Sequence, residues 1–317
     1  MGIFLNPAAH LMSILKQICV IMLNKLSISA VLVVLTILTL NLTDLDDKIW
    51  YLLHDSSINK ETKNNSVWLP EYQADITDLQ IPGITGNASG ITYDFDRKTL
   101  WIIVNGPTYL IEIDLQFNLL RRIKLKNFKD TEAIAYVGND YYLLTDERDQ
   151  TITLAKISGQ TKQLDKNALQ QIVLNLHGYS NKGLEGIAVD YVTNTIFAVR
   201  ERDPMLLIKI TGFIENNNRI NIQNHDQIKV NDLYMDDLSG LHYDSNTDHL
   251  LFLSDESRLL AEIDLQGNKV SYMDLENGFN NLNRSIPQAE GVTLDSEGYL
   301  YIVSEPNLLY RFKKGDK

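Results

Sequence analysis

The sequence predicts an all-β protein, a five-bladed β-propeller that follows one N-terminal transmembrane helix. Three observations predict this fold: one short pattern recurs five times, strand-like apolar runs follow each recurrence, and one long uncharged run stands near the start. The recurrences are about 43 to 54 residues apart, which is typical of propeller blades, each of them a small antiparallel sheet. An open β-sandwich is the alternative fold, but it does not account for the repeats.

The uncharged run covers residues 26–43 and reads LSISAVLVVLTILTLNLT. As a helix it is roughly 27 Å long, enough to cross the hydrocarbon core of a membrane. Lys16 and Lys25 precede it and an aspartate-rich stretch follows it, so the positive-inside rule places residues 1–25 in the cytoplasm and the C-terminal part outside. A cleaved signal peptide and a buried core helix are the alternatives; the run ends without a small-residue cleavage site.

The charge is divided unevenly along the 317 residues. The chain has 29 Lys and Arg against 41 Asp and Glu, a net charge of −12, of which the first 43 residues carry +2 and the remainder −14. This acidity argues against nucleic acid as a partner. Cys19 is the single cysteine, which excludes an intrachain disulfide and a multi-cysteine zinc site.

The rest of the chain divides into a tether and one folded domain. Residues 44–66 are polar and predict a tether, and residues 67–317 form the propeller. Met22 is a second candidate for the true start, because the segment that follows it has the form of a complete signal anchor.

Each of the five repeats opens with Ser or Glu, a small residue and an apolar run. The openings are Ser89-Gly90-Ile91-Thr92-Tyr93-Asp94, Glu132-Ala133-Ile134-Ala135-Tyr136, Glu185-Gly186-Ile187-Ala188-Val189-Asp190, Ser239-Gly240-Leu241-His242-Tyr243-Asp244 and Glu290-Gly291-Val292-Thr293-Leu294-Asp295. They predict the innermost strands of the blades, because runs of this composition bounded by turn residues are typical of β-strands.

Three further runs complete most repeats. The second runs are apolar and cover residues 100–104, 141–145, 195–199, 250–254 and 300–304. A third run alternates apolar and polar residues, and the letters EIDLQ occur in it twice, at residues 112–116 and 262–266. A fourth, more polar run predicts the outer edge of each blade. The last repeat has no fourth run, so we expect residues 71–76 to pair with it and close the ring.

The innermost strands of a propeller line its central channel, so the residues that open the repeats are expected to converge there. They are three carboxylates and two hydroxyls: Ser89, Glu132, Glu185, Ser239 and Glu290. Carboxylates held together repel one another, which raises their pKa values or requires a cation. Hard oxygen ligands without clustered Cys or His favour Ca²⁺ over Zn²⁺.

A second acidic set ends the second runs of the repeats. It consists of Asp146, Glu147, Glu201, Asp255, Glu256 and Glu305, with Asn105 at the matching place in the first repeat. The pattern leaves three roles open for these residues: further metal ligands, groups that orient the opening residues, or solvated turn residues. Arg200 is expected to line the channel, and an ion pair of Arg200 or Arg202 with Glu185 or Glu201 would be purely structural. His242 is the histidine expected to face the channel or its core.

No catalytic motif accompanies these residues: the sequence has no G-x-S-x-G, no H-E-x-x-H and no phosphate-binding glycine loop. The sequence therefore predicts a calcium-binding module with a protein or small-molecule partner at the channel face. A calcium-dependent hydrolase that acts on a phosphoester or a lactone is the alternative, by analogy with other propellers alone.

Over about residues 67–314 the chain resembles the SdiA-regulated family. The resemblance is carried by the anchor and by Ser89-Gly90, Asp146-Glu147, Glu185-Gly186, Ser239-Gly240, Asp255-Glu256 and Glu290-Gly291, with Ala133 as a departure where other repeats have Gly. It implies a five-bladed propeller, a bound calcium ion and a periplasmic domain held on the bacterial inner membrane by a single span. It implies no known activity.

Overall fold

A computed structural model describes residues 29–33, 53, 58–174, 183–215, 219–225 and 227–315. The chain divides into two units, Met1–Leu52 and Leu53–Lys317. In the first unit residues 29–33 are helical, and the rest of the predicted transmembrane segment lies outside the described residues. Within the described part, no helix has the length and apolar character that a membrane crossing requires.

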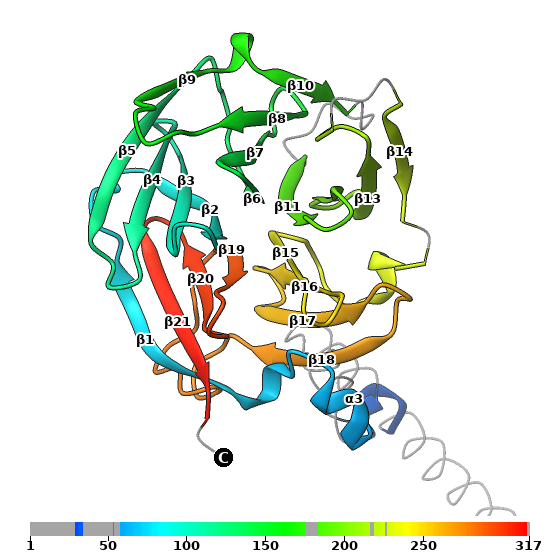
Figure 1. Ribbon diagram of the computed structural model, residues 1–317. Helices are drawn as coiled ribbons and strands as arrows, with labels where there is room; N and C mark the ends of the chain where they lie inside the picture. The colour runs from blue at the N-terminus through cyan, green and yellow to red at the C-terminus, as the bar shows by residue number, and fades with distance from the viewer. Residues whose placement is uncertain are drawn as a thin grey trace, which may run out of the picture. The chain divides into compact units, whose positions relative to one another are not determined.

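The second unit consists of five antiparallel sheets around a central axis (Figure 1). Their innermost strands are β2 (Asn87–Asp94), β6 (Ile134–Gly138), β11 (Leu184–Asp190), β15 (Gly240–Asp244) and β19 (Ala289–Leu294). The second strands are β3 (Thr99–Asn105), β7 (Tyr141–Asp146), β12 (Thr195–Arg200), β16 (His249–Ser254) and β20 (Leu300–Ser304). The five openings thus form the five inner strands, which confirms the predicted five-bladed propeller.

The remaining strands complete the blades in the predicted order. The third strands are β4 (Tyr109–Asp114), β8 (Thr151–Lys156), β13 (Leu206–Thr211), β17 (Leu259–Asp264) and β21 (Leu308–Lys314). The outer strands of the first four blades are β5 (Leu119–Lys126), β10 (Gln170–Val173), β14 (Asn221–Asn224) and β18 (Lys269–Asp274). A short additional strand, β9 (Gln163–Asp165), pairs in parallel with β5 and extends the first blade.

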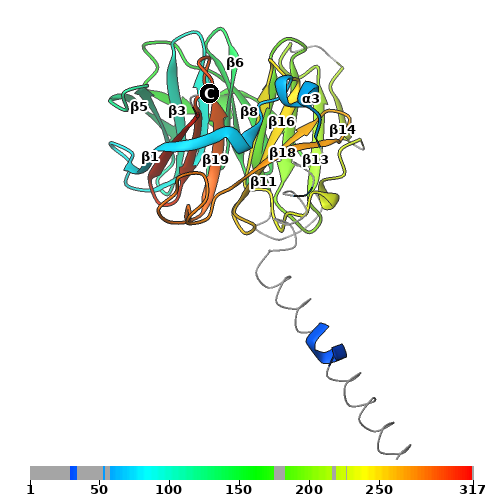
Figure 2. The same cartoon turned by 90° about the horizontal axis from the view of Figure 1, so that it is seen from below.

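The ring is closed by β1 (Tyr72–Gln80), which lies outside β21 and supplies the outer strand of the fifth blade (Figures 1 and 2). The two strands pair antiparallel from Tyr72 opposite Lys314 to Gln80 opposite Leu308. The predicted closure is therefore confirmed. It joins the two sequence ends of the domain in one sheet and removes an exposed sheet edge.

The hydrophobic core is divided into layers between neighbouring blades. One layer joins Ile91 and Ile102 of the first blade to Tyr301, Val303 and Leu309 of the fifth. The second strand of the first blade is buried along almost its whole length. The inner and second strands are the most apolar because each blade buries both of its faces against neighbours.

The outer strand of the fourth blade departs from the predicted polar edge. Strand β14 is exposed throughout, whereas β18 is largely buried. The cause is the leading segment, residues 67–71, which covers β18 and includes the short helix η1 (Leu69–Glu71). The Leu69 amide donates to Ser271 Oγ of β18 at 3.0 Å.

The repeated letters EIDLQ show how this segment is held. In the first blade Glu112 accepts hydrogen bonds from Thr99 Oγ1 at 2.9 Å and from the Arg121 guanidinium. In the fourth blade Glu262, which is fully buried, instead accepts the backbone amides of Val67 at 2.7 Å and Trp68 at 3.0 Å. The same residue therefore stabilises a blade in one repeat and holds the leading segment in another.

A layer of small residues lets the inner strands approach one another. A Cβ atom at Gly291 would lie 2.8 Å from the Cα of Gly90 and 2.8 Å from the backbone nitrogen of Ile91. Both contacts are shorter than van der Waals distance, and both partners are backbone atoms that do not rotate away. The Ser-Gly and Glu-Gly pairs of the sequence therefore mark the places where neighbouring blades meet at the axis.

Candidate metal site at one end of the channel

The residues that open three of the repeats stand on β-bulges. In β2, β11 and β19 the pairing with the second strand skips one residue, and the skipped residues are Ser89, Glu185 and Glu290. A bulge leaves its extra residue unpaired and redirects that residue's side chain. The predicted ring of opening residues is therefore produced by a local irregularity of the strand.

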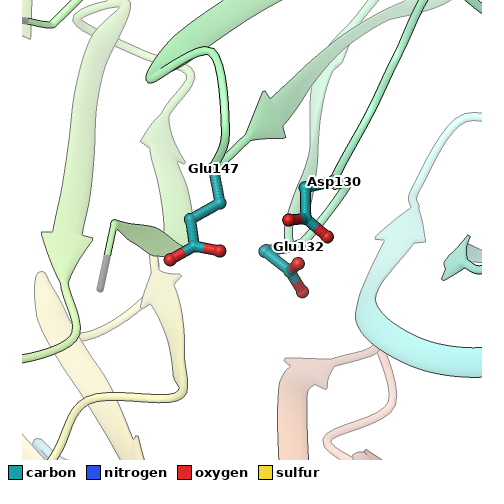
Figure 3. Close-up of side chains that lie close together, drawn as sticks. All are labelled: Asp130, Glu132 and Glu147. Carbon is teal, nitrogen blue, oxygen red and sulfur yellow. The ribbon is translucent and has the colours of Figure 1, made fainter. Parts of the chain in front are cut away.

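Three carboxylates gather at this end of the channel (Figure 3). Asp130, Glu132 and Glu147 each offer an oxygen that lies within 4.8 Å of the other two. Asp130 and Glu132 lie in the connection between β5 and β6, and Glu147 follows β7. Two residues expected at the metal site are thus brought together, and they are joined by one that was not predicted.

Hydrogen bonds from neighbouring blades hold these carboxylates in place. Asn105, at the end of β3, donates its amide to Asp130 Oδ1 at 2.7 Å and to Glu132 Oε1 at 3.2 Å. The Gly183 amide, just before β11, donates to Glu147 Oε1 at 2.8 Å. Each bond links the second strand of one blade to the loop that opens the next, so the cluster is fixed by the ring as a whole.

Burial, and then the charges of Asp130 and Glu147, raise the pKa of the Glu132 carboxyl to about 9. Burial also raises the pKa of Glu290 to about 9, with a further contribution from Glu185. The pKa of Glu185 is raised well above its ordinary value by burial and then by the charge of Glu132. Three of the five opening residues therefore interact electrostatically across the channel, as the sequence predicted.

The acidic surface continues into a cavity of about 310 Å³ beside the cluster. It is lined by Glu185, Glu201, Arg202, Asp237, Ser239, Asp255, Glu256, Gln288 and Glu290. Arg202 is its one basic residue among the described lining, and its guanidinium bonds to Glu201 at 2.7 Å and to Glu256. Arg202 therefore makes, with Glu201, one of the ion pairs that the sequence suggested. We call the cluster and this cavity together the acidic mouth.

The second acidic set mostly orients the loops of the acidic mouth. Asp255 Oδ1 accepts the Ala289 amide of the next blade at 3.1 Å. The Glu305 amide donates to the Gln288 carbonyl at 3.0 Å, and burial raises the pKa of the Glu305 carboxyl, against which a hydrogen bond from Asn87 acts. Of the three roles that the sequence left open for this set, orientation of the neighbouring loop is therefore common among its members.

The predicted residues outside the carboxylate cluster include Asp146, Ser239, Arg200 and His242. Asp146 is fully buried and bonds to Lys166 Nζ at 2.8 Å, so it supports the blade. Ser239 donates its hydroxyl to the Ala289 carbonyl at 2.6 Å. Arg200 is buried at the end of β12 and is absent from the described linings of the channel cavities. His242 lines the opposite end of the channel.

The sequence pattern did not predict two acidic residues of the mouth, Asp130 and Asp237, as site residues. A signal for them exists, because both stand two residues before an opening residue of a repeat. The five residues at this position are Asn87, Asp130, Gly183, Asp237 and Gln288. Burial raises the pKa of Asp237 to about 6, and its Oδ1 accepts the Glu256 amide at 3.1 Å.

A family model described as SdiA-regulated matches residues 64–313, most of the chain. The chain belongs to the SdiA-regulated family. Among solved structures, this SdiA-regulated propeller is similar to a nidogen–laminin complex, with 16% identity, a TM-score of 0.44 and coverage of 68% of this chain and 72% of that one.

Two enzymes of known structure are also similar to the SdiA-regulated chain. A luciferin-regenerating enzyme is 10% identical, with a TM-score of 0.48 and coverage of 75% of this chain and 95% of that one. A gluconolactonase of Xanthomonas campestris is 12% identical, with a TM-score of 0.47 and coverage of 72% of each chain. Each is a similarity of fold at low identity, and no function follows from it.

The side chains of the SdiA-regulated mouth fit a hard cation. Asp130, Glu132 and Glu147 offer oxygen alone, which suits Ca²⁺ or Mg²⁺ better than a softer metal. Ser89 Oγ lies beside Glu132, is buried and has no hydrogen-bond partner of normal geometry in the described structure. A buried hydroxyl without a partner is costly, and a cation or its hydration water would satisfy it.

Proposed function

We propose that this chain is a membrane-anchored, periplasmic propeller that binds Ca²⁺ at the acidic mouth and acts there as a binding module. The observation that carries the proposal is the cluster of Asp130, Glu132 and Glu147, whose oxygens lie within 4.8 Å of one another. The raised pKa values of Glu132 and Glu185 reflect first the burial of these carboxylates and then the repulsion between neighbouring charges, both of which a bound cation would offset.

Residues of the cluster would hold the ion through carboxylate oxygens, and Asn105 would contribute its amide oxygen after turning that group. Ca²⁺ takes six to eight oxygen ligands at about 2.3–2.6 Å and accepts irregular geometry. Three carboxylates and one amide leave coordination positions for water or for an oxygen of a partner molecule. When bound, the ion would add positive charge to a mouth in which Arg202 is already paired with Glu201 and Glu256, and the exposed Arg148 with Asp130 at 3.0 Å. The ion would bind Asp130 beside Arg148 or in its place.

The location rests on the sequence. Residues 26–43 form an uncharged apolar run with lysines before it and aspartates after it. The acidic domain follows that run, and the tether of residues 44–66 separates the two. We infer that a single span holds the propeller on the outer side of the bacterial inner membrane, with the acidic mouth available to a protein or small molecule of the periplasm.

Calorimetric titration of the full-length protein in mild detergent tests the calcium site. We expect saturable Ca²⁺ binding, a higher melting temperature in calcium, and an affinity that Glu132→Gln lowers at least about tenfold, which is roughly 1.4 kcal/mol. Glu215→Gln is the matched control, since Glu215 is an exposed carboxylate outside the mouth. Absence of binding by the folded protein, or equal affinities of the two variants, would contradict the site.

Hydrolysis is assayed separately on the same preparations. A binding module shows no turnover of phosphoesters or lactones with calcium or with EDTA. Calcium-dependent turnover that Glu132→Gln abolishes would assign the chain to the hydrolases and would replace the module as its function, while leaving the metal site in place.

A further inference from the structure

The end of the channel opposite the acidic mouth contains a second cavity, of about 220 Å³. All five inner strands run toward it, and Tyr93 at this end is four positions along the strand from Ser89 at the acidic mouth. At about 3.3 Å per residue the two ends are roughly 13 Å apart. Between them, at the layer that contains Gly90 and Ile91, the open space of the channel has a volume of only about 10 Å³. This space holds no more than about one water molecule. The second cavity is therefore a separate compartment.

Aromatic rings form much of the wall of this cavity. They are Tyr93, Phe95, Tyr136, Tyr191 and Tyr243. The Phe95 ring packs 4.9 Å, centroid to centroid, from Tyr136 and 4.9 Å from Tyr191. Phe95 is 37% exposed and Tyr191 is 42% exposed, so these two rings stand at the rim where a ligand would enter.

The tyrosine hydroxyls of this wall already have partners. Tyr243 donates to Asp248 Oδ1 at 2.7 Å, and the Tyr136 hydroxyl donates to Asp96. The Tyr191 hydroxyl lies 2.7 Å from Ser245 Oγ. Since the hydroxyls are engaged in this way, the rings themselves are what the wall offers to a ligand.

The charge of the wall has one sign. Asp244 and Asp295 line the cavity, and none of the described lining residues is Lys or Arg. Asp244 accepts hydrogen bonds from Asn246 and Thr247 of its own turn, and Asp295 accepts them from backbone amides of its turn and from the Tyr301 hydroxyl at 2.9 Å. These bonds position the two side chains without neutralising their charge, so the compartment favours a positively charged molecule.

His242 breaks the pseudo-symmetry of this end. The matching residues of the other inner strands are small: Thr92, Ala135, Ala188 and Thr293. The imidazole makes no hydrogen bond to another residue of the described chain, and burial lowers its pKa to about 4. At neutral pH it is therefore an uncharged group, able to accept or donate one hydrogen bond to a molecule in the cavity.

We propose that this cavity binds a small organic ammonium ion, held by the faces of Phe95 and Tyr191 and by the negative charge of Asp244 and Asp295. A cation over an aromatic face gains about 0.5–2 kcal/mol, and cages of several rings are the usual way in which proteins recognise ammonium groups. Pockets for drug-sized ligands enclose roughly 300–1,000 Å³, so a volume of about 220 Å³ suits a smaller molecule. His242 receives the polar end of that molecule.

The test is a titration of the full-length protein with choline and with 2-phenylethylamine in the presence of EDTA. Calorimetry and ligand-observed NMR measure the binding. The uncharged isostere of choline, 3,3-dimethylbutan-1-ol, is the matched ligand. We expect at least one of the two cations to bind saturably, and the isostere to bind at least about fivefold more weakly than choline when choline is the binder. EDTA keeps this result independent of the calcium site.

Variants locate the bound ion. Phe95→Ala and Tyr191→Ala remove exposed rings and should each weaken binding about two- to fivefold. Phe279→Ala is the control, since Phe279 is 50% exposed on a loop outside the cavity. The proposal is overturned if neither cation binds saturably, if choline is the binder and its isostere binds equally well, or if the two rim variants bind as tightly as the control. A melting curve for each variant confirms that it is folded.

Discussion

The two ends of the propeller channel are built by the same five strands and have opposite chemistry. At the acidic mouth the strands begin, and bulges direct Ser89, Glu185 and Glu290 toward a shared space. At the other end three of the strands carry a tyrosine, Tyr93, Tyr136 and Tyr243, in a wall that also contains an uncharged His242. The pseudo-symmetry of the propeller determines where side chains of different blades come together, whereas the residue type at each strand position determines what the resulting site binds.

Both ends depend on the layer of small residues between them, and Gly291→Val should therefore have the largest effect. The new side chain would begin 2.8 Å from the backbone of Gly90 and would force neighbouring blades apart, at a cost of about 3 kcal/mol or more. We expect little folded protein, or a melting temperature many degrees lower, and loss of ligand binding at both ends.

Gly159→Val is the matched control, because nothing lies within 4 Å of a Cβ at Gly159. Thermal unfolding of the two variants measures the difference. If Gly291→Val melts within a degree or two of the control, the close packing of the inner strands is wrong.

The adjacent carboxylates Asp146 and Glu147 separate support of the blade from binding at the mouth. Asp146→Asn leaves Lys166 buried with Asp149 as its remaining carboxylate, 2.9 Å away, and should reduce the free energy of unfolding by about 3 kcal/mol. Glu147→Gln should leave that free energy unchanged or higher in the absence of calcium, since it removes one repelling charge. Chemical denaturation gives both values.

Calcium titration of the same two variants completes this test. Asp146→Asn should bind calcium as the unchanged protein does, and Glu147→Gln at least about tenfold more weakly. The opposite ranking of affinities would show that the ion sits behind the blade, at Asp146, rather than in the mouth.

The pH dependence of stability should have opposite signs at the two ends. Glu132 has a pKa of about 9 in the folded, calcium-free protein and an ordinary value near 4.5 when unfolded. The folded state therefore binds more protons between these values, so its stability falls as pH rises from about 4.5 to 9. His242 has a pKa of about 4 when folded and 6.5 when unfolded, so its contribution rises with pH between about 4 and 6.5.

Denaturation midpoints across this range, measured in EDTA, test both signs. Glu132→Gln should flatten the fall at high pH, and His242→Gln should flatten the rise at low pH. Calcium should oppose the fall, because it favours the ionised carboxylates. A stability that rises steadily from pH 5 to 9 in EDTA would contradict the assignment of the acidic mouth.

Much of the fold could be predicted because the same order of apolar runs and turn residues recurs in each repeat. The alternation of strand and turn residues gave all five blades, and the unpaired run at residues 71–76 gave the closure by β1. The fourth run of the fourth repeat was predicted to be a polar outer edge, but β18 is largely buried, because Leu69 bonds to its Ser271 from about two hundred residues away in sequence. Contacts of that range leave no local signal.

The acidic mouth was predicted in outline and not in detail. The opening residues predicted Glu132, but Asp130 joins it from the connection between β5 and β6, outside the strands that the sequence pattern identifies. Asp146 has the same position relative to its strand as other members of the second acidic set, yet Lys166 neutralises it in the blade. Which carboxylates can bind a cation and which instead stabilise a blade thus depends on contacts that form only in the folded structure.

A crystal structure of the protein grown with calcium tests the central claim most directly. The proposed function predicts one ion with strong anomalous density at the acidic mouth, within about 2.3–2.6 Å of oxygens from Asp130, Glu132 and Glu147. An empty cluster at saturating calcium, or an ion bound elsewhere with these three side chains uninvolved, would contradict it.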